Sequence, residues 1–191
     1  MIPASAQQLY ARLSATPQRR VATLAVVATV VGLILVTALW LGPRWTMYSL
    51  EGTGLVVELP AAPEASRAGV AGAPAPLFQV RTSHLAVVAS GGALPADSKP
   101  DLSSLAQQAM AHVQATPGIA DLDYRVGQER IGGQACLVVA GTFRRDGVAS
   151  RLQGAFFVLP THHGHVLCFW SDAQGARQAS RVLQSVRPAS R

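Results

Sequence analysis

The sequence has few charged residues: they make up 14% of its 191 positions, whereas a soluble domain carries about 25%. Hydrophobic residues account for 49%. This composition excludes a disordered tail, a charged coiled coil and a polyelectrolyte binder, because each of these needs a high density of charge. The length suits one modest domain with an additional segment and is too short for two full domains.

Acidic residues are absent from the first 44 residues, which hold four arginines. The remaining residues carry twelve Lys and Arg against ten Asp and Glu, so most of the net charge of +6 arises at the N-terminal end. A nucleic-acid-binding domain instead presents a basic patch or stripe on its folded surface. We therefore expect no nucleic-acid partner.

Catalytic and cofactor-binding motifs are also absent from the sequence. It contains no G-x-S-x-G, no H-E-x-x-H, no phosphate-binding loop and no C-x-x-C. Asp121 and Asp123 form a pair of carboxylates, but their place just after Pro117 and Gly118 is typical of a loop that enters a strand. We therefore expect a protein that is not an enzyme and has no cofactor.

One long apolar run extends from Val21 to Leu41 without a charged residue. As a helix it would span roughly 31 Å, the thickness of the hydrocarbon core of a bilayer. Arginines precede the run, and aromatic residues lie around its other end, as at membrane–water interfaces. The candidate membrane-interface residues are Arg19, Arg20, Trp40, Trp45 and Tyr48.

The run is longer than the apolar core of a cleavable signal peptide, which has about 7–15 residues, and the sequence Leu41–Trp45 is a poor cleavage site. A buried core helix would show a polar stripe, which this run lacks. We therefore predict an uncleaved signal anchor. The predicted organisation is a cytoplasmic segment (1–20), a transmembrane anchor (21–42), a juxtamembrane linker (43–53) and an exported α+β domain (54–188).

The arginines around the run predict its orientation. Arg12, Arg19 and Arg20 precede it, while Arg44 alone follows closely. By the positive-inside rule the N-terminus stays in the cytoplasm and the C-terminal domain is exported. We therefore expect a protein of the bacterial inner membrane with a periplasmic domain, in contact with the lipid bilayer through residues 21–41.

Alternating and helical patterns predict the elements of the exported domain. We expect a strand at 55–59, a loop at 60–76, a hairpin of strands 78–82 and 85–90, a helix from Asp101 to about Pro117, a meander of strands 123–130, 135–144, 148–159 and 165–170, and a last helix that follows a capping box at Ser171 and Gln174. Two of these strands, Cys136–Ala140 and Ala155–Leu159, are apolar at consecutive positions, so both faces of the sheet should be covered. The predicted fold is an antiparallel β-sheet flanked by two helices.

This order of elements is accompanied by particular residues at the ends of the expected strands and helices. They are the opening Gly54–Glu64, the turn Phe143–Gly147, the segment Phe169–Asp172 and the helix segment Val182–Val186. In these features the chain, over residues 50–188, resembles the PsbP-like α/β/α sandwich family, which includes DcrB-like envelope proteins. The resemblance implies a non-enzymatic binding or assembly role and carries over no functional residue.

Two clusters of side chains are candidate contact sites. Arg144, Arg145 and Arg151 gather around one hairpin tip, where they either meet an acidic partner or anionic headgroups, or simply solvate the tip. Three histidines, His162, His163 and His165, fall within a predicted turn at 160–164 and its edge. A solvated turn is the preferred interpretation there, and weak metal binding is the alternative.

The two cysteines, Cys136 and Cys168, are the only possible disulfide pair. The predicted hairpins place both opposite Phe156, on the same face of the sheet but with one strand between them. Their Cα atoms would then lie about 9–10 Å apart, beyond the reach of a disulfide. We therefore predict two buried thiols.

Taken together, these patterns favour a membrane-anchored exported domain that binds an envelope protein partner. The alternative is a carrier that holds a small apolar ligand or lipid between a helix and the sheet. An enzyme is a third hypothesis, which needs a convergent polar pocket that the sequence does not reveal.

Overall fold

The computed structural model describes residues 44–70, 73–95 and 100–189. The predicted cytoplasmic segment and anchor, with Arg19, Arg20 and Trp40, lie outside the described residues. Neither of the two helices within these ranges has the length and apolar character that crossing a membrane requires. The described part forms one compact unit that begins at Arg44.

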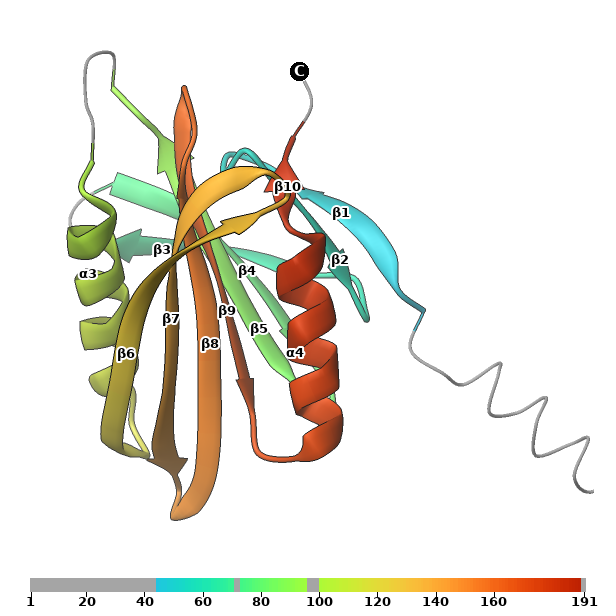
Figure 1. Ribbon diagram of the computed structural model, residues 1–191, viewed down its shortest axis with the longest axis vertical. Helices are drawn as coiled ribbons and strands as arrows, with labels where there is room; N and C mark the ends of the chain where they lie inside the picture. Colours follow the sequence, from blue (N-terminus) through green and yellow to red (C-terminus); the bar gives the residue numbers. More distant parts are fainter. Residues whose placement is uncertain (1–43, 71–72, 96–99, 190–191) are drawn as a thin grey trace, which may run out of the picture. The chain divides into compact units, whose positions relative to one another are not determined.

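A seven-stranded antiparallel sheet forms the centre of the domain, with the strand order β3-β4-β5-β9-β8-β7-β6 (Figure 1). Its strands are β3 (Glu64–Val70), β4 (Ala73–Arg81), β5 (Ala86–Ala93), β6 (Ile119–Ile131), β7 (Gln134–Arg145), β8 (Val148–Val158) and β9 (His162–Trp170). The predicted hairpin and the predicted four-strand meander are both confirmed.

A helix lies on each face of this sheet, as the sequence predicted (Figure 1). Helix α3 (Leu102–Gln114) buries Ala106, Met110 and Val113 against one face. Helix α4 (Ala173–Ser185) lies on the other face, together with a second sheet in the order β1-β2-β10. The strands of this second sheet are β1 (Thr46–Leu50), β2 (Leu55–Leu59) and β10 (Arg187–Pro188).

The central strands are buried on both faces, which explains their unbroken apolar runs. Along β7, Cys136 and Val138 pack under α4 while Leu137 and Val139 pack under α3. Strand β8 behaves in the same way. The consecutive apolar residues in the sequence therefore correctly predicted that both faces of these strands are covered.

An aspartate caps each helix. The Asp101 side chain accepts hydrogen bonds from the backbone N–H groups of Ser103 and Ser104, as predicted for the start of α3. In α4 the cap is Asp172, whose carboxylate accepts from the Gly175 N–H at 2.7 Å. The prediction of a capping box at Ser171 was therefore placed one residue too early.

The predicted linker 43–53 instead contains a strand, β1, which pairs with β2 and buries Leu50. The predicted loop 60–76 instead contains β3 and the first residues of β4. Residues 73–76 pair with β3 alone, since the pairing of β4 with β5 starts at Leu77. Proline is tolerated there because a strand with one unpaired side needs fewer N–H donors. The Ala-, Pro- and Gly-rich composition of residues 60–76 therefore suggested a loop, although pairing within the folded sheet makes these residues form strands.

The histidine cluster lies on a strand and not in a turn. The turn before β9 is short, because the Leu159 N–H donates to the His162 carbonyl at 2.8 Å. This turn places Phe156 opposite His165, and the two-residue turn between Arg145 and Val148 places it opposite Leu137. The predicted pairing of Phe156 with both cysteines is therefore wrong in register. Alternation still places both thiols under α4, on β7 and β9 with β8 between them.

Candidate ligand-binding groove

A single helix is too narrow to cover one whole face of the large sheet. Seven strands at about 4.8 Å spacing are about 29 Å wide, whereas a helix with its side chains measures about 10–12 Å. Helix α3 packs over β6, β7 and β8. Beside it, over β4, β5 and β9, lies a pocket of about 350 Å³, which we call the groove.

The strand wall of the groove is a grid of paired residues from β4, β5 and β9. Its three rows are the Arg row (Arg81, Ala86, Phe169), the middle row (Gln79, Val88, Leu167) and the His row (Leu77, Ser90, His165). On β8, Gly154 pairs with Leu167 of β9, and the absence of a side chain at Gly154 leaves room for the Leu167 side chain. The Arg row and the His row lie four residues apart on β5, which is about 13 Å.

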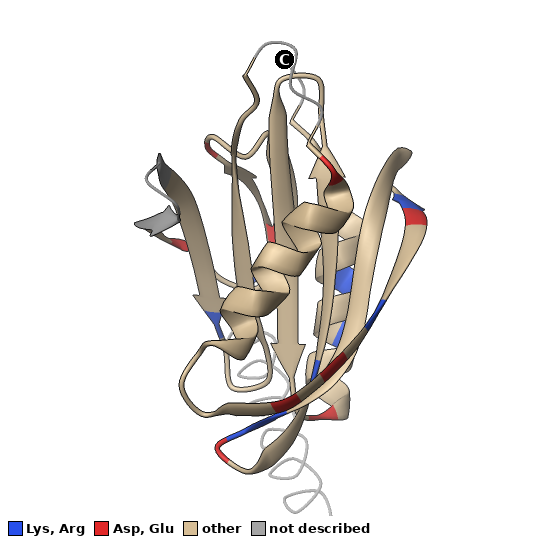
Figure 2. Cartoon of the chain, turned by 90° about the vertical axis from the view of Figure 1, so that its left-hand side faces the viewer, with Lys and Arg blue, Asp and Glu red and all other residues tan. Residues whose placement is uncertain are grey.

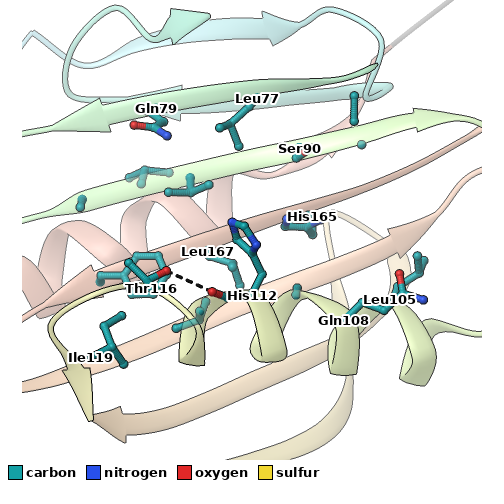
Figure 3. A pocket seen from close by; sticks show the side chains of 18 of the residues that line it. Leu77, Gln79, Ser90, Leu105, Gln108, His112, Thr116, Ile119, His165 and Leu167 are labelled. Atoms are coloured by element: carbon teal, nitrogen blue, oxygen red, sulfur yellow. Dashed lines mark hydrogen bonds between the residues drawn. The ribbon is translucent and has the colours of Figure 1, made fainter. Parts of the chain in front are cut away.

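The opposite wall comes from α3, which carries no Lys, Arg, Asp or Glu. Leu105, Gln108, Ala109 and His112 line the groove from this helix. In Figure 3 His112 rises from α3 toward the strand wall that holds Leu77, Gln79 and Ser90. Figure 2 shows the same side of the molecule, where α3 and the sheet beside it are almost free of charged residues.

The hydroxyl groups of the groove are already hydrogen-bonded. The Ser90 hydroxyl donates to the Pro76 carbonyl at 2.8 Å, and the Thr116 hydroxyl donates to the His112 carbonyl at 3.0 Å. Neither is therefore positioned as a nucleophile beside a base. Phe143 and Phe169 meet edge to face at one end, with ring centroids 6.0 Å apart. The groove thus offers apolar surface, a few amide and imidazole groups, and two arginines.

Alternation along β9 divides the three clustered histidines. His163 and His165 face the groove. His162 does not line it, and its ring nitrogen lies 2.8 Å from the Thr161 hydroxyl. Within the described residues no group of three His, Cys, Asp or Glu side chains is arranged to hold a metal ion.

Two of the groove histidines, His163 and His165, favour the neutral form. Burial, and secondarily the nearby charge of His163, lowers the pKa of His165 to about 4, and its ring stacks on Phe156 with centroids 5.1 Å apart. Burial, with a smaller effect of His162, also lowers the pKa of His163, whose Nδ1 is buried without a partner in the described structure. At neutral pH this end of the groove is uncharged.

The three arginines of the hairpin tip lie on different faces. Arg145 lines the groove on the α3 side. Arg144 is its neighbour on β7, and Arg151 pairs with Thr142, so both project toward the α4 side. The structure therefore separates the set that the sequence grouped, and it brings Arg145 to the same groove as Arg81.

Trp45 and Tyr48, predicted at a membrane interface, belong to the folded domain and pack partly buried against its core. The Arg181 guanidinium lies over the Trp45 ring, 4.3 Å from its centroid. It also donates two hydrogen bonds to Glu58, at 2.7 and 2.9 Å, and these lower the pKa of the Glu58 carboxyl. This cluster ties the start of the domain to α4.

The two thiols are buried core groups. The structure describes both as free cysteines. Burial raises the pKa of the Cys168 thiol well above its usual range and raises that of Cys136 as well, where the charge of Glu129 adds to the effect. Both therefore stay protonated and pack as small apolar side chains.

Sequence reasoning gave a ligand site between a helix and the sheet only as the alternative, and it missed most of the residues that line the groove. Arg81, Gln79 and Leu77 alternate at the end of β4, a signal that they share one face. His112 lies on a helix and belongs to no sequence motif, so nothing in the sequence marks it as a groove residue. The sequence does not determine the lateral position of α3 on the sheet. That position leaves β4, β5 and β9 uncovered on that face.

Comparison with known proteins identifies the fold. No family model matches the chain, and no curated protein matches it. Among solved structures, CyanoP, the cyanobacterial PsbP of Synechocystis, is similar with a TM-score of 0.54 and 10% identity, over 77% of this chain and 94% of that chain.

Two further structures are similar at lower scores. One is LpqN of Mycobacterium tuberculosis, a protein involved in cell envelope biogenesis, with a TM-score of 0.47, 13% identity and coverage of 77% and 91% of the two chains. The other is PA94 of Pseudomonas aeruginosa, a protein of unknown function, with a TM-score of 0.42, 18% identity and coverage of 78% and 99%. At such identities likeness shows the fold alone. The described domain therefore has the PsbP-like fold that the sequence resembles.

Proposed function

We propose that this protein is a non-enzymatic binding protein of the bacterial envelope, whose domain holds an apolar ligand in the groove beside α3. The observation that carries the proposal is the groove itself. Its volume of about 350 Å³ falls within the range of small-molecule sites, and apolar side chains with a few polar groups are the usual lining of such sites. The mode of action is sequestration, with no bond made or broken.

The N-terminal run supports a location at the inner membrane for this activity. Residues 21–41 would anchor the chain, and the arginines at 12, 19 and 20 would keep the N-terminus in the cytoplasm. The domain would then collect its ligand on the periplasmic side, close to the bilayer. Protease added to spheroplasts should remove the domain and spare the N-terminus; protection of the domain would reverse this orientation.

A photoreactive lipid tests the binding proposal on the full-length protein in its membrane. Long-chain probes with a diazirine in the chain, one ending in a carboxylate and one in an alcohol, are added and crosslinked by light. Labelled peptides are then identified by mass spectrometry. We expect labelling of groove peptides from β5, β9 and α3.

A matched pair of variants on α3 controls this experiment. Ala109 lines the groove, and Ala109→Phe should fill it and abolish groove labelling. Ala111 is exposed on the same helix and does not line the groove, so Ala111→Phe should leave labelling unchanged. If neither probe labels the groove, or if Ala109→Phe has no effect, the groove is not a binding site for an apolar chain.

A second candidate is the envelope protein partner expected from the sequence. The observation that favours it is Val126, which is 49% exposed on the long edge strand β6. An edge strand can pair with an added strand from another chain. In-cell crosslinking from a reactive residue placed at Gly127 would capture such a partner. If the protein keeps the mass of the uncrosslinked chain in every envelope fraction after crosslinking, this partner is excluded.

A further inference from the structure

The charged side chains of the groove lie toward one end of its strand wall, and two of its three imidazoles lie toward the other. Arg81 on β4 and Arg145 on β7, with three strands between them, line the first end, His163 and His165 line the second, and His112 reaches in from α3. We infer that the groove takes a single-chain anionic amphiphile, such as a long-chain carboxylic acid, with its headgroup at the arginine end. The inference rests on the proposed function and adds the chemical class and the direction of the ligand.

The charge of the lining selects an anion. Among the described residues that line the groove there are two arginines and no aspartate or glutamate. A guanidinium presents paired N–H donors whose geometry matches a carboxylate. Arg81 makes no ion pair within the described residues, and Arg145 has one contact with Asp146 at a long 3.9 Å. Each guanidinium group is therefore available to an incoming carboxylate, Arg81 from β4 and Arg145 from β7.

Two features oppose an anion at this end, and both are weak. The Asp146 carboxylate is 77% exposed, so water screens its charge. The C-terminal end of α3 also points here, with the partial negative charge of its last carbonyls. Three of those carbonyls are already hydrogen-bonded: the Ala115 and Thr116 N–H groups donate to Ala111 and Val113, at 3.0 and 3.1 Å, and the Thr116 hydroxyl donates to His112.

The rest of the groove suits one apolar chain. From the Arg row the strand wall continues through Val88 and Leu167 to the His row, about 13 Å away. His165 is neutral at physiological pH because burial depresses its pKa, and its ring lies flat against Phe156. The far end therefore presents an uncharged surface to the chain terminus.

The size of the groove favours one chain over two. Its volume of about 350 Å³ lies near the lower limit of ligand sites, which extend to about 1,000 Å³. A diacyl phospholipid carries twice the apolar volume of a single-chain acid of the same length. The single-chain acid therefore fits the observed groove better than a membrane phospholipid does.

The carboxylate and alcohol photoprobes described above test the headgroup. At subsaturating concentration we expect the carboxylate probe to label groove peptides about three- to tenfold more than the alcohol, as ion pairs with two exposed arginines imply. The double variant Arg81→Gln/Arg145→Gln should reduce carboxylate labelling to the level of the alcohol. The readout is the ratio of carboxylate to alcohol labelling in the same variant.

The control uses the other arginines of the same hairpin. The double variant Arg144→Gln/Arg151→Gln removes two charges on the α4 side and should not change either signal. Equal labelling by the two probes, or equal losses in both double variants, would overturn the anion inference while leaving the proposed function intact. Absence of groove labelling by both probes would overturn the proposed function itself. Unfolding curves of each variant establish that the fold is kept.

Discussion

The two faces of the large sheet differ in how completely they are covered. Under α4, the helix and the β1-β2-β10 sheet share the cover, and residues such as Val57, Phe157 and Val182 are fully buried. Under α3, one helix covers three strands, and Leu77, Val88 and Phe169 remain half-buried. The first face is a closed core that stabilises the fold, and the second leaves apolar surface that a ligand can bury.

The largest expected effect is on the free energy of unfolding, when one side chain from each face of the sheet is truncated to alanine. Phe157→Ala opens a cavity in the closed core and should lower the free energy of unfolding by about 3–5 kcal/mol. Leu77→Ala in the groove should lower it by less than about 1 kcal/mol, because water already reaches that side chain. Denaturant unfolding of the full-length protein measures both. Equal losses would mean that the groove is a closed core in solution.

A second comparison adds an atom instead of removing one. At Gly175 on α4, a Cβ would overlap the His84 carbonyl and lie 2.6 Å from the Trp170 Cβ, so Gly175→Ala should destabilise the protein by about 1–3 kcal/mol. The control is Gly127→Ala on the edge strand β6, where a Cβ meets nothing within 4 Å. That change should be neutral or slightly stabilising. A harmless Gly175→Ala would mean that α4 is packed less tightly than described.

The groove face should make stability depend on pH. The pKa of His165 is about 4 in the folded protein and about 6.5 when unfolded, so its contribution is full above about pH 6.5 and is lost as pH falls toward 4. Between pH 6.5 and 5 the free energy of unfolding should fall by about 1–2 kcal/mol from this group. His163 adds in the same direction.

The variant His165→Gln isolates that contribution. Its free energy of unfolding should change less between pH 6.5 and 5 than that of the unmodified protein. The window avoids the carboxylates Asp101, Asp172 and Glu58, whose lowered pKa values place their titration at more acidic pH. If the free energies of unfolding of the variant and the unmodified protein change by the same amount between pH 6.5 and 5, His165 is not buried in solution.

The smallest expected effect concerns the exposed rim of the closed face. Glu58→Gln removes the carboxylate that accepts both hydrogen bonds from Arg181, and a slight loss of stability should result. Because Arg181 lowers the pKa of Glu58, the difference should be present at pH 7 and vanish as pH falls through that lowered pKa. Glu51→Gln, at an exposed turn, is the control. A difference that persists at low pH would point to packing on Trp45 instead.

The stronger patterns of the sequence predicted much of the fold. The spacing of Ala106, Met110 and Val113 placed the buried face of α3, and the consecutive apolar residues of β7 showed that both faces were covered. Weaker patterns failed. The Ala-, Pro- and Gly-rich residues 60–76 have poor strand propensity, and only pairing with neighbouring strands makes β3 and β4.

The candidate site was less predictable than the fold. The sequence grouped Arg144, Arg145 and Arg151 by proximity, whereas alternation on the strands sends only Arg145 to the groove. Arg81 and His112, which line the groove with it, lie far away in the sequence and carry no motif. Distances between such residues depend on strand order and register, which a single amino-acid sequence does not give.

By itself the sequence determined the two helices, the hairpin and the four-strand meander, their order, and the two-sided burial of the central strands, because periodicity is a local property of the chain. It also determined the apolar run at 21–41, whose role awaits the topology experiment. Only the tertiary structure decided that α4 shares its face with a second sheet while α3 stands alone beside β9, β5 and β4. The physical reason is width: a helix covers about 10–12 Å of a sheet about 29 Å wide, and where it sits is settled by packing between residues distant in sequence.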